Sequence, residues 1–256
     1  MTIKGQVVDT ETAQEFMAQV LDRVTKSELG DIVGELEYKS TRFQQILVQA
    51  HIPELTEDEV FDLLRHVFAT RRRARPVLDS LGLDFFRTAP LDLLYGESPV
   101  ADRFQTFVTA MQNNFVPVDD SLELPVNLCC DLAAELLHFT DPDSNWLWAR
   151  WMWDPKPATG AMPLVVEDDF DLNGETPGEI YTRMGIATAF VKATGEAAGF
   201  SKLTNSPFDI DVFLACVYAI YMYTTLRMRM TQEFNKVVPQ LPELVRRLLG
   251  TWRSNL

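Results

Sequence analysis

A run of fifteen residues without a single charge extends from Val212 to Leu226. Its apolar side chains would occupy every side of a helix, and such a helix is buried either in a protein core or in a membrane. A membrane-spanning helix needs about 20 consecutive apolar residues. This run is shorter, contains three tyrosines and is flanked by aspartates and arginines. The sequence therefore predicts a buried central helix over about residues 207–238, and no membrane span.

The composition narrows the class of protein further. Hydrophobic residues make up 46% of the 256 residues, which is enough for a substantial core. The formal net charge of −14 opposes binding to nucleic-acid phosphates. The three cysteines form no CxxC pair, and the first residues contain no apolar segment of signal-peptide length. These features predict a soluble, acidic, cytoplasmic protein with reduced thiols.

Most of the remaining chain is predicted to be helical, because apolar residues recur at spacings of three and four. Thr56 and Glu59 have the spacing of a capping box, and Thr176-Pro177 provides an N-cap followed by proline at the first helical position. The expected helices cover residues 9–24, 31–50, 56–75, 98–111, 125–139, 176–198, 207–238 and 242–250, with shorter pieces over 77–97. Eight or nine helices predict an all-α, multi-helix bundle.

Residues 146–166 depart from this pattern. Four tryptophans lie between residues 146 and 153, at spacings that fit neither a helix nor a strand, and prolines and a glycine follow. We expect an irregular segment or a small β-hairpin inserted into a single domain of residues 1–256. The surrounding segment 141–176 is the candidate boundary between two subdomains.

Two of the predicted helices carry carboxylates and histidines on one face. Glu59, Asp62 and His66 share a face of the first, and Glu135 and His138 form a Glu-x-x-His step on the second. Di-metal proteins use this step because it directs one oxygen and one nitrogen at the same ion. These five residues are therefore candidate ligands for two iron or manganese ions. The alternative is that both sets lie on the solvated polar faces of amphipathic helices.

Arginines are concentrated at Arg71, Arg72, Arg73 and Arg75. If they end the helix predicted over residues 56–75, their positive charge complements the helix dipole, which is a structural role. The alternative is that they bind a phosphate, a carboxylate cofactor or an acidic partner protein.

Tryptophan and arginine also occur together at Trp148, Arg150 and Trp151. These residue types dominate the binding energy of protein–protein interfaces, so they are candidate partner-binding residues. The alternative is that the tryptophans pack in the core or between subdomains.

The chain contains no phosphate-binding glycine loop, zinc-binding pattern, kinase motif or G-x-S-x-G elbow. The first hypothesis is therefore a non-catalytic protein that binds another protein, as an assembly factor, an adaptor or an accessory subunit, without a cofactor. The second is a helical di-iron or di-manganese oxidase. The third is a protein that binds a small molecule or cofactor between helices, with the tyrosine-rich central helix as a wall.

Overall fold

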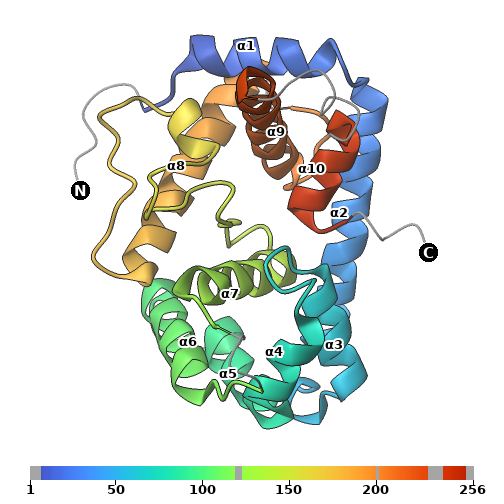
Figure 1. The fold of residues 1–256 in the computed structure, drawn as a ribbon, viewed down its shortest axis with the longest axis vertical. Helices are drawn as coiled ribbons and strands as arrows, with labels where there is room; N and C mark the ends of the chain where they lie inside the picture. Colours follow the sequence, from blue (N-terminus) through green and yellow to red (C-terminus); the bar gives the residue numbers. More distant parts are fainter. Residues whose placement is uncertain (1–6, 119–122, 200–201, 230–238, 252–256) are drawn as a thin grey trace. The chain divides into compact units, whose positions relative to one another are not determined.

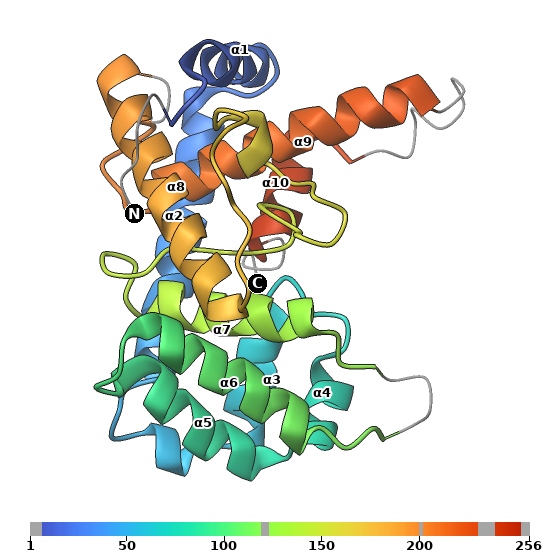
Figure 2. The same cartoon turned by 90° about the vertical axis from the view of Figure 1, so that its left-hand side faces the viewer.

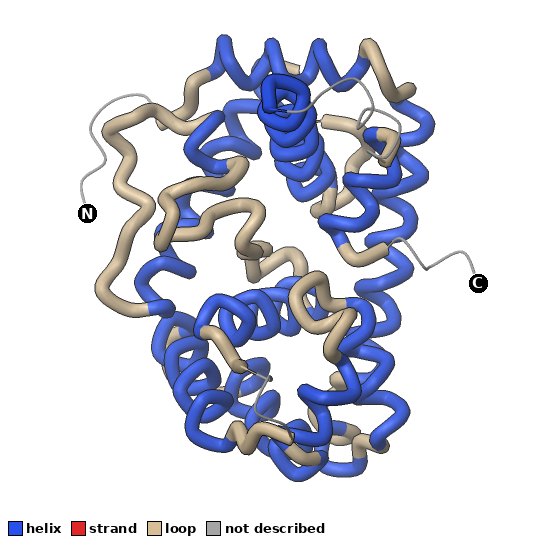
Figure 3. The backbone as a smooth tube through the Cα atoms, viewed as in Figure 1, coloured by secondary structure: helices blue, strands red, loops and turns tan. Residues whose placement is uncertain are grey.

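The computed structural model describes residues 7–118, 123–199, 202–229 and 239–251 (Figure 1). These residues form ten α-helices, two short 3₁₀ helices and no β-strand (Figure 3). Two isolated bridges, Val8 to Val166 and Asp154 to Thr159, are the β-type pairs within the described ranges. The predicted all-α fold is confirmed. Residues 146–166 are irregular apart from η2 (Met162–Leu164), the bridge between Asp154 and Thr159, and Val166, which is bridged to Val8.

The chain divides into two compact units, each built from separate segments. Unit 1 comprises Met1–Glu37, Trp151–Leu172 and Ile186–Leu256, and unit 2 comprises Tyr38–Arg150 and Asn173–Gly185. Helices α2 (Lys26–Ile46) and α8 (Pro177–Ala198) each contribute residues to both units.

Unit 1 is organised around α9. The other helices that lie wholly in it are α1 (Thr10–Leu21) and α10 (Leu241–Leu249), and both pack against α9 (Asp209–Arg229), as Figure 2 shows. The Asp209 carboxylate holds the start of α9, since it accepts hydrogen bonds from the backbone N–H groups of Leu203 and Thr204.

The predicted central helix is buried over its first half. Every residue of α9 from Ile210 to Val217 is buried, whereas Tyr221 and Tyr223 are half-buried and Thr224 is exposed. Its predicted extension over residues 230–238 lies outside the described residues. None of the described helices combines the length and the apolar content that crossing a bilayer requires.

Unit 2 has a buried helix of its own, which is α7 (Val126–Thr140). Twelve consecutive residues, Leu128–Phe139, are buried, and α7 packs against its neighbours α5 and α6. The remaining helices of this unit are η1 (Ile52–Glu54), α3 (Glu57–His66), α4 (Ala74–Leu81), α5 (Leu83–Tyr95) and α6 (Val100–Asn114).

The capping box at the start of α3 is confirmed. Thr56 Oγ1 accepts a hydrogen bond from the Glu59 backbone N–H at 3.3 Å, and Glu59 Oε2 accepts one from the Thr56 N–H at 2.8 Å. Leu55 and Val60 on either side are both buried, as expected for the hydrophobic contact that accompanies such a box.

The prediction of one helix over residues 56–75 is wrong. Helix α3 ends at His66, residues 67–73 form turns, and α4 begins at Ala74. Pro76 therefore lies in the first turn of α4, where the N–H that proline lacks would have no partner within the helix. Pro90 lies inside α5 and does not end it, so residues 77–97 form two helices, α4 and α5, instead of short pieces.

Candidate functional site

A lysine is buried in unit 2 between α2 and α7. The Lys39 side chain is 1% exposed, and its Nζ lies 2.7 Å from Glu135 Oε2 and 3.9 Å from the centre of the Phe139 ring. The other carboxylate oxygen of Glu135 accepts a hydrogen bond from the Phe68 backbone N–H at 2.8 Å. Both oxygens of the buried carboxylate are thus engaged, which offsets part of the cost of removing two charges from water.

A second buried carboxylate lies one helical turn earlier on α7. Asp131 is 2% exposed and accepts hydrogen bonds from the backbone N–H and the Nε of Arg150, both at 2.8 Å. Burial raises the pKa of Asp131 to about 7, although the charge and hydrogen bonds of Arg150 act in the opposite direction. The Asp131 carboxyl therefore titrates near neutral pH.

The interpretation of the α7 acids as a solvated polar face is wrong. Asp131, Glu135 and His138 are all at most 2% exposed. Their partners explain why: Arg150 and Lys39 bind the two carboxylates, and the His138 Nδ1–H donates to a backbone carbonyl at 2.8 Å. Arg150 and Lys39 come from other segments of the chain, so the sequence of α7 alone does not reveal them. Without them, the acids of α7 resemble the solvated face of an amphipathic helix.

Sequence reasoning missed Lys39, although α2 contains a signal for it. Leu36 and Phe43 lie three residues before and four residues after it, so all three side chains share one face of the helix. Leu36 and Phe43 are both buried. A lysine on an apolar stripe is buried only when it has a partner, and that partner is Glu135.

The candidate metal ligands on α3 have other partners. Besides its role in the capping box, Glu59 Oε1 lies 2.8 Å from His51 Nε2. The Asp62 carboxylate accepts a hydrogen bond from Arg42 Nε at 2.6 Å. His66 donates its Nδ1–H to the backbone carbonyl of Asp62 at 2.8 Å. These contacts stabilise α3 and its neighbours without a metal ion.

The candidates on α7 are likewise engaged, Glu135 with Lys39 and His138 with the carbonyl of Asn145. Within the described ranges, no three side chains of histidine, cysteine, aspartate and glutamate are grouped so that they could hold a metal ion. Among the residues that the structure describes, these candidates are therefore engaged with other partners and are not grouped around one ion position.

Trp148 and Trp151 are core residues, 5% and 2% exposed. In unit 2 the Trp148 ring stacks on the Phe104 ring, with the ring centroids 5.8 Å apart. In unit 1 the ring centroids of Trp151 and Tyr218 are 6.3 Å apart. The structure thus agrees with the alternative for these two tryptophans, which is packing in the core. Arg150 is a third exposed but is held by Asp131.

The cysteines are also internal. Cys129, Cys130 and Cys216 are buried free thiols. Burial raises the pKa of Cys129 and of Cys216 to about 12. Burial also raises the pKa of Cys130 far above its ordinary value. Thiols with such pKa values are protonated at neutral pH and are therefore poor nucleophiles.

The arginine turn, residues 67–73, connects α3 to α4 in unit 2. Its backbone is fixed, since the buried Thr70 hydroxyl donates to the Leu64 carbonyl at 2.6 Å and the Arg73 N–H donates to the Thr70 carbonyl at 2.7 Å. Arg72 and Arg73 are exposed and make no ion pair with any described residue. The turn thus presents two cations that no described residue neutralises, on a backbone held by hydrogen bonds.

The other two arginines of the cluster have contacts of their own. Arg71 lies over the Phe68 ring, 4.7 Å from its centre. Arg75, in the first turn of α4, pairs with Glu57 at 3.3 Å and with Asp79 at 2.9 Å. The four arginines therefore separate into two that are engaged within the protein and two that face solvent.

The expectation that these arginines complement a helix dipole is wrong. It required them to end a helix, whereas Arg73 is the residue that precedes the first turn of α4 and gives it no side-chain cap. The N-terminal end of a helix carries a partial positive charge, so cations there are unfavourable and anions are favourable. The position of Arg72 and Arg73 is thus suited to an anionic group and has no evident benefit for the fold.

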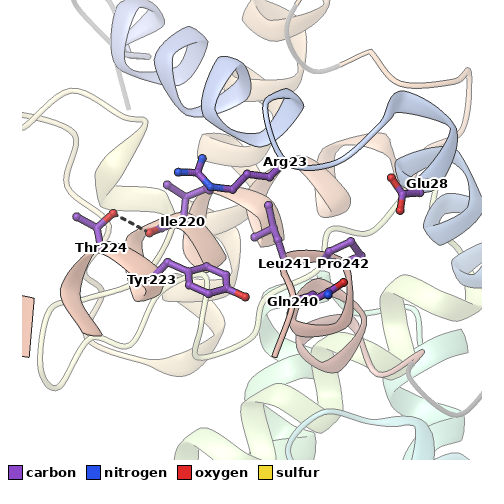
Figure 4. A pocket seen from close by; sticks show the side chains of 8 residues that line it. All are labelled: Arg23, Glu28, Ile220, Tyr223, Thr224, Gln240, Leu241 and Pro242. Carbon is purple, nitrogen blue, oxygen red and sulfur yellow. Dashed lines mark hydrogen bonds between the residues drawn. The ribbon is translucent and has the colours of Figure 1, made fainter. Parts of the chain in front are cut away.

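Unit 1 contains a pocket of about 490 Å³ beside the second half of α9 (Figure 4). Its volume lies in the range typical of small-molecule sites, about 300–1,000 Å³. Side chains from α9, from the start of α10, from the connection between α1 and α2 and from the first turn of α2 line it: Arg23, Glu28, Ile220, Tyr223, Thr224, Gln240, Leu241 and Pro242. From the sequence, the central helix α9 was expected as a possible wall of a pocket. The lining residues outside α9 were not predicted.

The sequence matches no family model, and neither the curated proteins nor the solved structures include a significant match.

Proposed function

We propose that this protein acts by binding another protein, as an assembly factor, an adaptor or an accessory subunit, and that the arginine turn of unit 2 contacts an acidic segment of that partner. The observation that supports the proposal is the pair of exposed, unneutralised arginines, Arg72 and Arg73, at the N-terminal end of α4. An acidic chain of net charge −14 offers many carboxylates that could neutralise them, yet none of the described ones does so.

Two physical arguments favour a carboxylate-rich ligand here. The arginine guanidinium forms paired hydrogen bonds with carboxylates, and arginine is enriched among the residues that dominate protein interfaces. The hydrogen bonds of Thr70 and Arg73 fix the backbone of the turn, so little backbone conformational entropy is lost when a partner binds.

The test is affinity enrichment of the full-length protein at native expression level, comparing the wild type with the double variant Arg72→Glu/Arg73→Glu. A matched control is Lys156→Glu/Lys202→Glu, which makes the same change in net charge at two exposed positions of unit 1. We expect a protein that is retained by the wild type and the control and lost from the arginine variant. Its retention should also weaken as salt is raised.

Two outcomes would contradict the proposal. One is a wild-type protein that retains no partner, and the other is a partner that all three proteins retain equally. Retention of nucleic acid in place of a protein, lost in the arginine variant, would reassign the turn to a different kind of ligand.

A further inference from the structure

We propose that the pocket in unit 1 binds a small organic molecule that carries one carboxylate on a flat apolar body. The inference is independent of the arginine turn, because the pocket residues all belong to unit 1 and the turn belongs to unit 2. It rests on how cationic, aromatic and acidic side chains are distributed around the pocket.

Arg23 is the cation of this pocket. One of its N–H groups donates to the Gln19 carbonyl at 2.6 Å, which holds the side chain in place, and Arg23 makes no ion pair with any described residue. Figure 4 shows its guanidinium on the same side of the pocket as Ile220 and Thr224, above Tyr223. The remaining N–H donors of the guanidinium are thus available to a carboxylate.

The surface below Arg23 suits an apolar ring. Tyr223 is half-buried, and the buried side chains of Ile220 and Leu241 lie next to it in the lining. An aromatic side chain with aliphatic neighbours binds flat apolar groups by stacking and by removing apolar area from water. A carboxylate at Arg23 would place the rest of the ligand against these residues.

The opposite side of the pocket disfavours a second negative charge. In Figure 4 the Glu28 carboxylate lies away from the Arg23 guanidinium. It accepts hydrogen bonds from the backbone N–H and the hydroxyl of Thr25 at 2.9 and 2.8 Å, and these bonds hold the pKa of Glu28 below its usual value. Glu28 is therefore ionised at neutral pH and repels an anionic group, so the ligand carries one carboxylate rather than two.

The test uses three defined probes, 2-naphthoate, its neutral analogue 2-naphthamide and 2,6-naphthalenedicarboxylate, in equilibrium dialysis up to millimolar concentration. We expect the wild type to bind the monocarboxylate about fivefold more tightly than the amide, the size of effect that a partly exposed ion pair provides. The dicarboxylate should bind no more tightly than the monocarboxylate. Arg23→Gln should remove the preference for naphthoate and leave the affinity for naphthamide unchanged.

Two further variants separate this site from non-specific binding. Arg65→Gln makes the same change in charge at an exposed position in unit 2, outside both proposed sites, and should preserve the preference. Tyr223→Ser should weaken the binding of 2-naphthoate and of 2-naphthamide by the same factor, about fivefold, because it removes the stacking surface and leaves the cation.

The proposal is overturned if the wild type binds neither naphthoate nor naphthamide, if it binds the two equally, or if Arg23→Gln keeps the preference. Circular dichroism of each variant verifies that the helices are intact, so a loss of binding reports on the pocket.

Discussion

Unit 2 contains two groups of charges with opposite surroundings. The charges on α7, Asp131 and Glu135, are nearly inaccessible, and each has a cationic partner within 2.8 Å. The charges of the arginine turn, Arg72 and Arg73, are exposed and have no ionic partner among the described residues. A buried charge without a partner would cost several kcal/mol, whereas an exposed one is solvated by water. Partners are therefore obligatory in the core, and unpaired cations at the surface are open to a role in binding.

The largest expected effect is the loss of one partner in the core. Glu135→Ala leaves the Lys39 ammonium buried without its carboxylate, and we expect the free energy of unfolding to fall by about 3–5 kcal/mol. The double variant Lys39→Met/Glu135→Leu removes both charges and should recover most of that loss. Urea unfolding of the three proteins measures both effects. A cost below about 1 kcal/mol for Glu135→Ala would mean that the ammonium reaches water, contrary to its 1% exposure.

The second effect concerns Asp131 and pH. Its pKa is raised from 3.8 to about 7 in the folded protein, so between these values the folded state binds more protons than the unfolded state. The contribution of this group to stability is therefore largest at low pH and falls as the pH rises from about 4 to about 7. The wild type should lose a few kcal/mol relative to Asp131→Asn across that window.

Unfolding free energies of wild type and Asp131→Asn, measured at half-unit steps of pH, give the difference directly. Other carboxylates, such as Glu59 with its lowered pKa, cancel because both proteins contain them. A difference that stays constant with pH would show that Arg150 keeps Asp131 ionised throughout.

The smallest effect has the opposite sign and lies in the arginine turn. Arg73→Gln removes a cation from the N-terminal end of α4, and we expect it to stabilise the protein by about 0.3–1 kcal/mol at low salt. The comparison variant is Arg247→Gln in the last turn of α10, which removes a favourably placed cation together with its ion pair to Glu243 and should therefore destabilise. Thermal unfolding at low and high salt checks both signs, and the two shifts should shrink together as salt screens them.

Local signals in the sequence identified much of the secondary structure. The capping box of Thr56 and Glu59 and the cap at Thr176 involve residues three positions apart, so their hydrogen bonds can be anticipated from spacing. Prolines were less informative. Pro76 directly follows the helix predicted over residues 56–75 and Pro90 lies in the predicted short pieces over 77–97, yet both are inside helices, α4 and α5. The error at Pro76 also placed the arginines at the wrong end of a helix.

The candidate sites depended on contacts that spacing does not reveal. Lys39 and Glu135 are 96 positions apart, and nothing in either helix identifies the other as its partner. Without that pairing, the acids of α7 resembled a solvated face, and Glu135 and His138 resembled metal ligands. The pocket is likewise formed by three segments separated in the chain, so only its α9 wall was anticipated.

The sequence by itself determined the all-α class, most helix positions and the burial of the first half of α9, because helical periodicity, caps and a long apolar run act over a few residues. The tertiary structure alone decided that α7 is a second buried helix, that its charges are paired, that Trp148 and Trp151 are internal and that Arg72 and Arg73 remain exposed. The physical reason is that the cost of burying a polar group depends on the partner it meets, and that partner comes from a distant part of the chain.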